Sequence, residues 1–399
     1  MTSPDRFAAL WRSLAPIGRT PNGYHRLSWT DADLACREWF LDEAADRGLR
    51  VQTDGNGNLW GWLGDPADGD AVVTGSHLDS VPGGGGYDGP LGIVSAFLAL
   101  DLLAKRGRTR RRPIGVVAFT EEEGSRFGVA CLGSRLLTGA LDPQRAAGLR
   151  DRDGVRLAEA MKSAGVDTSG LGPDPDRLAR IGTFIELHIE QGRALAVPVG
   201  VASAIWPHGR WRMEFTGQGN HAGTTRMADR HDPMLTFAFA VLAANKEARL
   251  RDGHATVGRV SVEPNATNAI PSSVTAWLDA RAADQSTVDA LLAAIEGRIT
   301  ERATRDGTGF AIEAESASPV VEFHTALRDR LASLLGGAPV LPTGAGHDAG
   351  VLAAHVPTAM LFVRNPTGVS HAPEESATDV DCAAGVEALA TVLEELACR

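Results

Sequence analysis

The sequence TGSHLDSVPGGGGYDG occupies residues 74–89 and decides the fold expected for this chain. The apolar run of residues 71–75 overlaps its start and is typical of a buried strand. His77 and Asp79 come directly after that run, and Asp88 lies 11 residues after His77. In open α/β sheets, functional side chains lie beyond the carboxyl ends of the strands. The stretch therefore predicts an α/β protein with a functional site at the end of this strand.

A glycine-rich loop after a strand can also cradle a phosphate group. Phosphate-binding loops of that kind end in Gly-Lys followed by Ser or Thr, an ending that residues 83–89 (GGGGYDG) lack. We therefore interpret these glycines as a flexible link between functional side chains, with phosphate binding as the minor alternative.

Further strands and helices extend from this stretch along the chain. Apolar runs at residues 113–120, 182–189 and 358–363 predict three more buried strands. Helices are predicted over residues 4–15, 30–47, 92–103, 325–335 and 380–396. We expect these elements to form an α/β catalytic domain of residues 1–205 and 317–399, with a mixed, largely parallel sheet flanked by helices.

The pattern changes between residues 206 and 316. The sheet-forming segments there are residues 210–216, 255–262, 273–282 and 310–314. Two helices, residues 233–248 and 288–302, alternate with these segments. Two helices on a small antiparallel sheet form an α+β layer, so we expect residues 206–316 to be a domain inserted into the larger one.

The composition is that of an ordinary globular protein. The 399 residues are 43% hydrophobic and 22% charged, and the formal net charge is −11. A chain of this length and hydrophobicity is expected to fold, and to form two domains rather than one. The acidic balance argues against nucleic acid and anionic membranes as partners.

The sequence also bears on the compartment. Residues 1–16 (MTSPDRFAALWRSLAP) lack the pattern of a signal peptide, and no stretch approaches the roughly 18 consecutive apolar residues of a membrane span. The cysteines show no paired short spacing; they are Cys36, Cys131, Cys382 and Cys398. We therefore expect a cytoplasmic protein with reduced cysteines.

Three consecutive glutamates follow the strand expected at residues 113–120. They lie in FTEEEGSRFG, residues 119–128. Such a run is usually a solvent-exposed face, but this one ends an apolar strand. Adjacent carboxylates raise one another's pKa unless a cation neutralises them. A metal ion beside the run would relieve the repulsion and leave one glutamate free as a base.

Two further motifs carry histidines that could complete a metal site. FIELHIEQG, residues 184–192, contains one near a strand end, and VSHAPEESA, residues 369–377, contains one in a loop. Either histidine alone is weak support, because a strand histidine is more often a core residue than a ligand. The candidate ligands taken together are His77, Asp88, Glu123, His188 and His371. Imidazole and carboxylate ligands suit Zn²⁺, Mn²⁺, Co²⁺ or Ni²⁺, and two ions about 3.5–4 Å apart could share one carboxylate.

The order of these motifs resembles the M20 family of dinuclear metallopeptidases and amidohydrolases. The motifs along the chain are HxD, YDG, EEE, ELHIEQG and SHAPEE. Within the family, EEEGSRF, ELHIEQG, GNHAGTT and GAGHDA are similar to the branch of N-carbamoyl-L-amino-acid hydrolases, β-ureidopropionases and allantoate amidohydrolases. The resemblance covers nearly the whole chain, and the combination is much more specific than any single motif.

The resemblance implies two divalent metal ions per subunit, Zn²⁺ or Mn²⁺ first, with Co²⁺ or Ni²⁺ as alternatives. His77 and His188 would ligate one ion, and Glu123 and His371 the other. Asp88 would bridge the two ions.

The resemblance also implies roles for the residues beside the metal ligands. Glu122 would be the general base that takes a proton from the attacking water and then gives it to the leaving nitrogen. Asp79 would orient His77 through a hydrogen bond. Relatives often have a cis peptide after the bridging aspartate, which predicts a cis bond between Asp88 and Gly89.

By the same resemblance, residues 206–316 form a lid and dimerisation domain. His221, in GNHAGTT, would stabilise the oxyanion of the tetrahedral intermediate in the partner subunit's site. Asn268 and Arg281 would bind the substrate's carboxylate, which a guanidinium pairs with bidentately, and could likewise serve the partner's site. Further substrate contacts implied by the resemblance are Gln191, Gly346 and His347.

The activity that follows is hydrolysis of a linear C–N amide bond. The first expectation is cleavage of the N-carbamoyl group of an L-amino acid, giving the amino acid, CO₂ and ammonia. Allantoate, which also presents a carboxylate and ureido nitrogens, is the near alternative, and N-acyl amino acids or dipeptides are more distant ones. A non-catalytic binding protein is disfavoured, because all the candidate ligands and Glu122 are present.

Two departures from the family pattern bear on the substrate rather than on the metal chemistry. Arg226 stands where the family usually has proline, and Trp206-Pro207-His208 is atypical.

Overall fold

The structure is a computed structural model that describes residues 3–399, and its chain forms two compact units. Within the described residues, the larger unit comprises residues 3–204 and Glu322–Arg399, and the smaller unit is Ile205–Val321. Residues 1 and 2 of the predicted catalytic domain lie outside the described residues. Strand β14 (Gly309–Ser318) carries the chain past the predicted junction at residue 316, so the second junction follows Val321.

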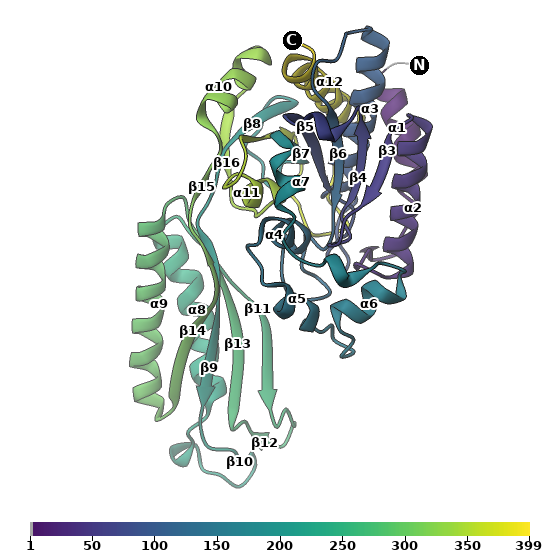
Figure 1. Cartoon of the computed structure of the whole chain (residues 1–399). Coiled ribbons are helices and arrows are strands. Elements are labelled where there is room, and N and C mark those ends of the chain that lie inside the picture. The colour runs from purple at the N-terminus through teal and green to yellow at the C-terminus, as the bar shows by residue number, and fades with distance from the viewer. Residues whose placement is uncertain (1–2) are drawn as a thin grey trace. The chain divides into compact units, whose positions relative to one another are not determined.

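A mixed sheet forms the centre of the larger unit (Figure 1). From one side its order is β15-β8-β17-β7-β5-β6-β4-β3, where β15 is Val321–Glu322, and β16 also pairs with β8. These strands are β3 Arg50–Thr53, β4 Leu59–Leu63, β5 Ala71–His77, β6 Ile114–Phe119, β7 Ile181–Ile189, β8 Val199–Ile205, β16 Val340–Thr343 and β17 Thr358–Val363. The expected mixed sheet is confirmed. Its parallel part is the central set β17, β7, β5 and β6, while β3, β4 and β8 join it antiparallel.

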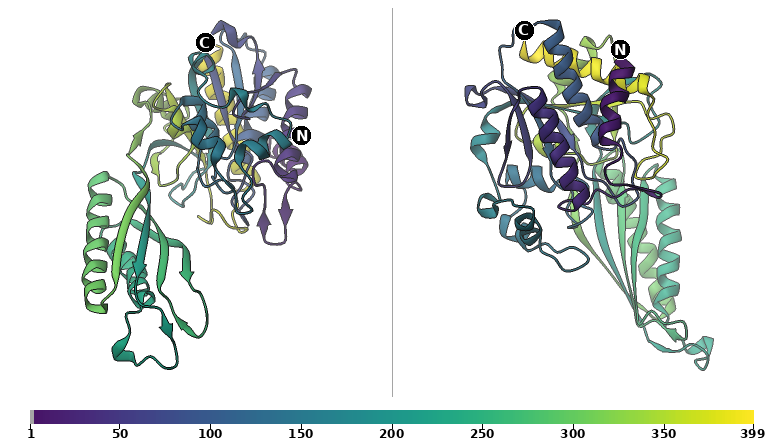
Figure 2. Two further views of the ribbon diagram at one scale, coloured as in Figure 1. Left: turned by 60° about the horizontal axis from the view of Figure 1, so that its bottom comes forward. Right: turned by 90° about the vertical axis from the view of Figure 1, so that its right-hand side faces the viewer.

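Helices cover the central sheet. Helices α1 (Ser3–Leu14), α3 (Pro90–Arg106) and α12 (Asp379–Ala397) pack together and share one apolar core with the sheet, and Figure 2 shows them side by side. The other helices are α2 Asp31–Asp46, α4 Leu132–Thr138, α5 Pro143–Gly148, α6 Leu157–Ser163, α7 Pro175–Ala179, α10 Thr325–Leu334 and α11 Asp348–Leu352. Within residues 3–399, no helix is long and apolar enough to cross a membrane.

Strand β7 shows how the sheet separates core from site. Ile185, Leu187 and Ile189 belong to the core shared with α3 and α12. Because successive strand side chains point to opposite faces, Glu186 and His188 project from the other face of the sheet. Both are buried there, as expected for a central parallel strand covered on its two faces.

The smaller unit is a four-stranded antiparallel sheet with the order β11-β13-β9-β14. Its strands besides β14 are β9 His208–Thr216, β11 His254–Glu263 and β13 Ser273–Arg281. Helices α8 (Pro233–Leu250) and α9 (Gln285–Asp306) pack on this sheet and enclose a separate apolar core (Figure 1). This confirms the expected pair of helices on a small antiparallel sheet.

Short pairings complete the list of strands. The short strands are β1 Arg19–Thr20, β2 Gly23–Tyr24, β10 Asn220–His221, β12 Ala269–Ile270 and β15 Val321–Glu322. Strand β1 pairs with β2 in the larger unit, and β10 pairs with β12 in the smaller one, both antiparallel.

Candidate metal centre and active site

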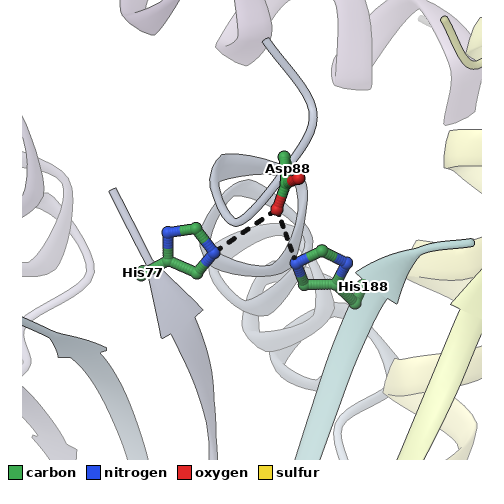
Figure 3. Close-up of side chains that lie close together, drawn as sticks. All are labelled: His77, Asp88 and His188. Atoms are coloured by element: carbon green, nitrogen blue, oxygen red, sulfur yellow. Dashed lines mark ion pairs between the residues drawn. The ribbon is translucent and has the colours of Figure 1, made fainter. Parts of the chain in front are cut away.

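Asp88 lies among three histidines in the larger unit. One carboxylate oxygen, Oδ1, is 3.6 Å from His77 Nε2 and 3.2 Å from His188 Nε2. The other, Oδ2, is 3.3 Å from His371 Nε2. His77 ends strand β5 and His188 lies near the end of the neighbouring strand β7, so two parallel strands deliver both imidazoles to the same sheet edge, as Figure 3 shows.

The three consecutive glutamates after β6 divide into different environments. Glu121 has a left-handed backbone, φ 54°, and its Oε1 accepts the backbone N–H groups of Arg126 and Phe127. Glu122 Oε2 lies 3.7 Å from His77 Nε2, and Glu123 Oε2 lies 3.4 Å from His371 Nε2. Glu121 thus shapes the loop, while the other two carboxylates face the histidines.

Asp79 links two parts of this centre. Its carboxylate accepts the backbone N–H groups of Glu122 at 3.2 Å and Glu123 at 3.1 Å. His77 Nδ1 lies 3.1 Å from the Asp79 carbonyl oxygen and 3.4 Å from Oδ1. Asp79 therefore fixes the glutamate loop and lies against the far side of the His77 ring.

The predicted substrate contacts in the larger unit lie beside the same cluster. Gln191 Nε2 donates to Asp88 Oδ2 at 2.8 Å. The His347 ring is buried, with its centroid 4.5 Å from that of His188, and His347 is the N-cap of α11. Gly346, which precedes it, is exposed. Gln191 thus contacts a candidate ligand directly.

Glu375 is a buried part of this centre to which the sequence reasoning assigned no role. Its Oε1 accepts the backbone N–H groups of Tyr87 at 2.8 Å and Asp88 at 3.0 Å, and Ser370 Oγ donates to its Oε2 at 3.3 Å. The residue belongs to VSHAPEESA, but the sequence does not distinguish it from its neighbour Glu374, which is exposed in the structure. A buried carboxylate thus holds the loop that carries Asp88.

The other predicted site residues lie in the smaller unit, at two ends of its sheet. His221 in β10 pairs with Ala269, and Asn268 precedes that residue. Arg281 ends the nine-residue strand β13, and the opposite end of β13 begins shortly after β12. The length of this extended strand, roughly 27 Å, therefore separates Arg281 from His221 and Asn268. Arg281 Nε and Nη2 donate to the Asp279 carboxylate at 2.7 and 2.8 Å.

The atypical residues are also placed in the smaller unit. The Trp206 ring lies 5.6 Å from the His254 ring, and His208 pairs in register with Arg281. Arg226 forms an ion pair with Asp229 on an exposed loop.

Burial and neighbouring charges shift the pKa values of the clustered groups. Burial raises the pKa of Glu123 to about 7, helped by the charge of Asp88, and raises that of Glu122 well above its ordinary value. Burial alone would also raise the pKa of Asp88, but the neighbouring imidazoles, with His188 the strongest, hold it well below the usual range. Burial lowers the pKa of His347 well below its ordinary value, so that ring is neutral.

The donor set fits divalent metal ions. Ligand atoms of His77, Asp88 and His188 lie within 4.8 Å of one another, and so do those of Asp88, Glu123 and His371. Among the described residues, His77 Nε2 and Glu123 Oε1 are buried without a hydrogen-bond partner, a state that a bound cation would relieve. A further group, Glu186, His188 and His347, shares one of these histidines.

The affinity for divalent ions should rise with pH. In the metal-free protein the pKa of Glu123 is about 7. Burial lowers the pKa of His371, but the nearby Asp88 carboxylate raises it by more, to about 9. Each group must lose its proton before it can bind a metal, so binding releases protons. We expect Kd for Mn²⁺ to fall by about tenfold per pH unit for each proton released, between about pH 6 and about pH 8. Calorimetric titration measures this, and a pH-independent Kd would contradict it.

Gly89→Ala should weaken metal binding. Gly89 has φ +85°, and an added Cβ would lie 2.4–2.5 Å from three atoms of the His77 ring. Gly107→Ala is the matched control, since Gly107 has φ +61° with nothing within 4 Å of an added Cβ. Both variants should lose about 1–2 kcal/mol of stability from the left-handed backbone. Only Gly89→Ala should lose metal content by mass spectrometry, and equal metal content in both would contradict the expectation.

The predicted cis peptide bond between Asp88 and Gly89 is wrong. The cis bond found among the described residues joins Glu263 and Pro264. The chain turns at Gly89 through its positive φ instead, and Gly89 becomes the N-cap of α3.

Comparison with known proteins adds to this geometry. The family model for peptidase family M20/M25/M40 matches residues 73–395. N-carbamoyl-L-amino acid amidohydrolase of Geobacillus stearothermophilus is 38% identical, covering 97% of this chain and 98% of the relative. Allantoate amidohydrolase of Escherichia coli K12 is 33% identical, covering 96% of each. The crystal structure of an amidase of the hydantoinase/carbamoylase family from Burkholderia vietnamiensis superposes with a TM-score of 0.91 at 32% identity, covering 99% of this chain and 98% of that one.

Proposed function

The chain belongs to peptidase family M20/M25/M40 and is an amidohydrolase, and we propose that it cleaves the N-carbamoyl group of an L-amino acid in a metal-dependent reaction. The observation that carries the proposal is the position of Asp88. Its carboxylate belongs to two separate groups of candidate ligands at once. That arrangement suits a dinuclear centre that shares one carboxylate.

Each subunit would hold two divalent ions, Zn²⁺ or Mn²⁺, with Co²⁺ or Ni²⁺ as alternatives. His77 and His188 would hold one ion, Glu123 and His371 the other, and Asp88 both. When bound, such ions lower the pKa of water and polarise a carbonyl. Gln191 and Ser370 donate to Asp88 Oδ2 and would hold its carboxylate in place.

Glu122 would act as the general base. It lies beside His77 but belongs to neither ligand group built on Asp88. It would take a proton from water as the water oxygen bonds to the carbamoyl carbon, and deliver that proton to the amino-acid nitrogen as the C–N bond breaks. The products are the amino acid and carbamate, which decomposes to CO₂ and ammonia. Asp79 would hold the glutamate loop and the His77 ring in place through its contacts with both.

Each unit contributes candidate residues for substrate recognition. Arg281 offers a guanidinium that pairs with a carboxylate, as it already does with Asp279. Asn268 lies beside His221 at the other end of β13, so its amide would reach the same substrate carboxylate from the partner subunit. His221 would donate to the oxyanion. The contacts proposed in the larger unit are Gln191, Gly346 and His347.

We further propose that the chain acts as a homodimer in which His221 completes the partner's site. The separation of His221 and Arg281 along β13 supports this, because one small substrate cannot touch both residues of the same chain. Helix α8 also leaves large apolar side chains exposed, namely Leu235, Val241, Leu242 and Leu250. Light scattering of the purified protein tests the assembly.

Allantoate is the second candidate substrate, favoured by the similarity to the Escherichia coli allantoate amidohydrolase. N-acyl amino acids are more distant candidates. The proposed compartment is the cytoplasm, which agrees with the free state of Cys36, Cys131, Cys382 and Cys398.

An ammonia-release assay tests the function. Ammonia is measured with N-carbamoyl-L-amino acids and allantoate, whereas the freed amino acid is measured with N-acetyl-L-amino acids, which release acetate instead. Metal-loaded and chelator-treated protein are compared with each substrate. N-carbamoyl-L-amino acids should give the highest kcat/KM, and chelation should abolish it. A higher kcat/KM with allantoate would make allantoate the preferred substrate in place of N-carbamoyl-L-amino acids. Unchanged activity after complete metal removal would overturn the mechanism.

A further inference from the structure

His221 is held from one side by backbone groups of its own loop. Its Nδ1 accepts hydrogen bonds from the backbone N–H of Gly223 at 3.0 Å and from that of Thr224 at 3.2 Å. A backbone N–H can only donate, so Nδ1 must accept and cannot itself carry a proton. In a neutral imidazole the proton then resides on Nε2.

The rest of GNHAGTT, residues 219–225, fastens the same residue. The backbone N–H of His221 donates to Asn220 Oδ1 at 2.8 Å, and Thr225 Oγ1 donates to the His221 carbonyl at 2.7 Å. A Cβ on Gly223 would lie 3.2 Å from His221 Cε1 and 3.5 Å from Nδ1, so a glycine lets the backbone come this close to the ring.

We propose that residues 219–225 form a clasp that fixes His221 as the Nε2–H tautomer and makes Asn220, Gly223, Thr224 and Thr225 its positioning residues. The clasp presents a single N–H donor, which suits an oxygen that gains negative charge. It leaves no free ring nitrogen to accept a proton, and therefore assigns His221 to donation rather than to general-base work. What His221 donates to rests on the proposed function, whereas the tautomer does not.

Nitrogen NMR of the full-length protein tests the tautomer directly. The chain is produced with ¹⁵N-labelled histidine, and the His221 signals are identified by their loss in His221→Gln. We expect Nδ1 in the range of an unprotonated nitrogen and Nε2 in the range of a protonated one. The reverse assignment, or both nitrogens in exchange between the two states, would overturn the clasp.

Gly223→Ala tests the close approach. It should shift the His221 nitrogen signals toward a mixture of tautomers and lower kcat more than it changes KM. Gly297→Ala, in α9 with nothing within 4 Å of the new Cβ, is the matched control and should change neither. Unchanged His221 signals in Gly223→Ala would contradict the role of Gly223.

Two replacements of the ring separate the clasp from the catalytic role. The amide nitrogen of Gln reaches about as far as Nε2, and that of Asn about as far as Nδ1. His221→Gln should therefore keep at least tenfold more kcat than His221→Asn. Equal kcat in both variants and in the wild type, with the Nε2–H tautomer seen by NMR, would overturn the oxyanion role and leave the clasp standing.

Discussion

Glu122→Gln lowers kcat by about 10²–10⁴-fold in our expectation, the range for removal of a positioned general base. The side chain keeps its shape and its place beside His77 but can no longer take a proton. Because Glu122 belongs to neither ligand group built on Asp88, the variant should retain its metal ions. Steady-state kinetics and metal analysis of the same preparation give both quantities.

Glu374→Gln is the matched control for this variant. Glu374 lies in VSHAPEESA close to His371 in sequence, but it is exposed in the structure. Its replacement should leave kcat and metal content unchanged. Full activity of Glu122→Gln would refute the assignment of the base, and loss of metal would make Glu122 a ligand instead.

Asp88→Asn should remove both metal ions and nearly all activity. The amide is almost isosteric but uncharged, and it would face three histidines with no anion between them. Loss of an outer partner of a metal ligand costs roughly 10–100-fold in affinity, so loss of a ligand shared by two ions should cost more. Lewis-acid stabilisation of several kcal/mol corresponds to about 10³-fold or more in kcat/KM.

Asp46→Asn, an exposed residue at the end of α2, is the control for the charge change and should behave as the wild type. Metal content by mass spectrometry and kcat/KM at fixed metal concentration are the measurements. An Asp88→Asn protein that keeps two tightly bound ions would rule out the shared carboxylate.

The elements with strong apolar patterns were predictable from the sequence. The central strands β5, β6, β7 and β17 and the long helices of both units lie where apolar runs and helical periodicity place them. The short helices α4, α5, α6 and α7 were not predicted, because one or two turns carry too little periodicity. Strand β14 extends beyond the expected residues 310–314, since its outer residues are exposed and have no apolar pattern.

The sequence predicted which side chains would lie close together at the candidate site, but not which contacts each of them makes. Each motif ends a strand or follows one, and that position alone brings His77 and His188 together. Adjacent identical residues are harder: nothing in EEE shows that Glu121 caps its own loop, and nothing in PEE shows that Glu375 is the buried one. Such differences depend on backbone direction after the strand ends, which side-chain pattern does not record.

The distances in sequence between the candidate ligands have a consequence for biogenesis. They extend from His77 to His371, and the whole smaller unit is translated between His188 and His371. A growing polypeptide emerges from the ribosome N-terminus first. The centre therefore cannot form until His371 has emerged, and only the last helix, α12, follows that residue. Bringing together segments so far apart in sequence is also slow, because a long loop must be closed first. Capture of the metal ions would thus be a closing event of maturation, and a truncated or stalled chain would be released without hydrolytic activity.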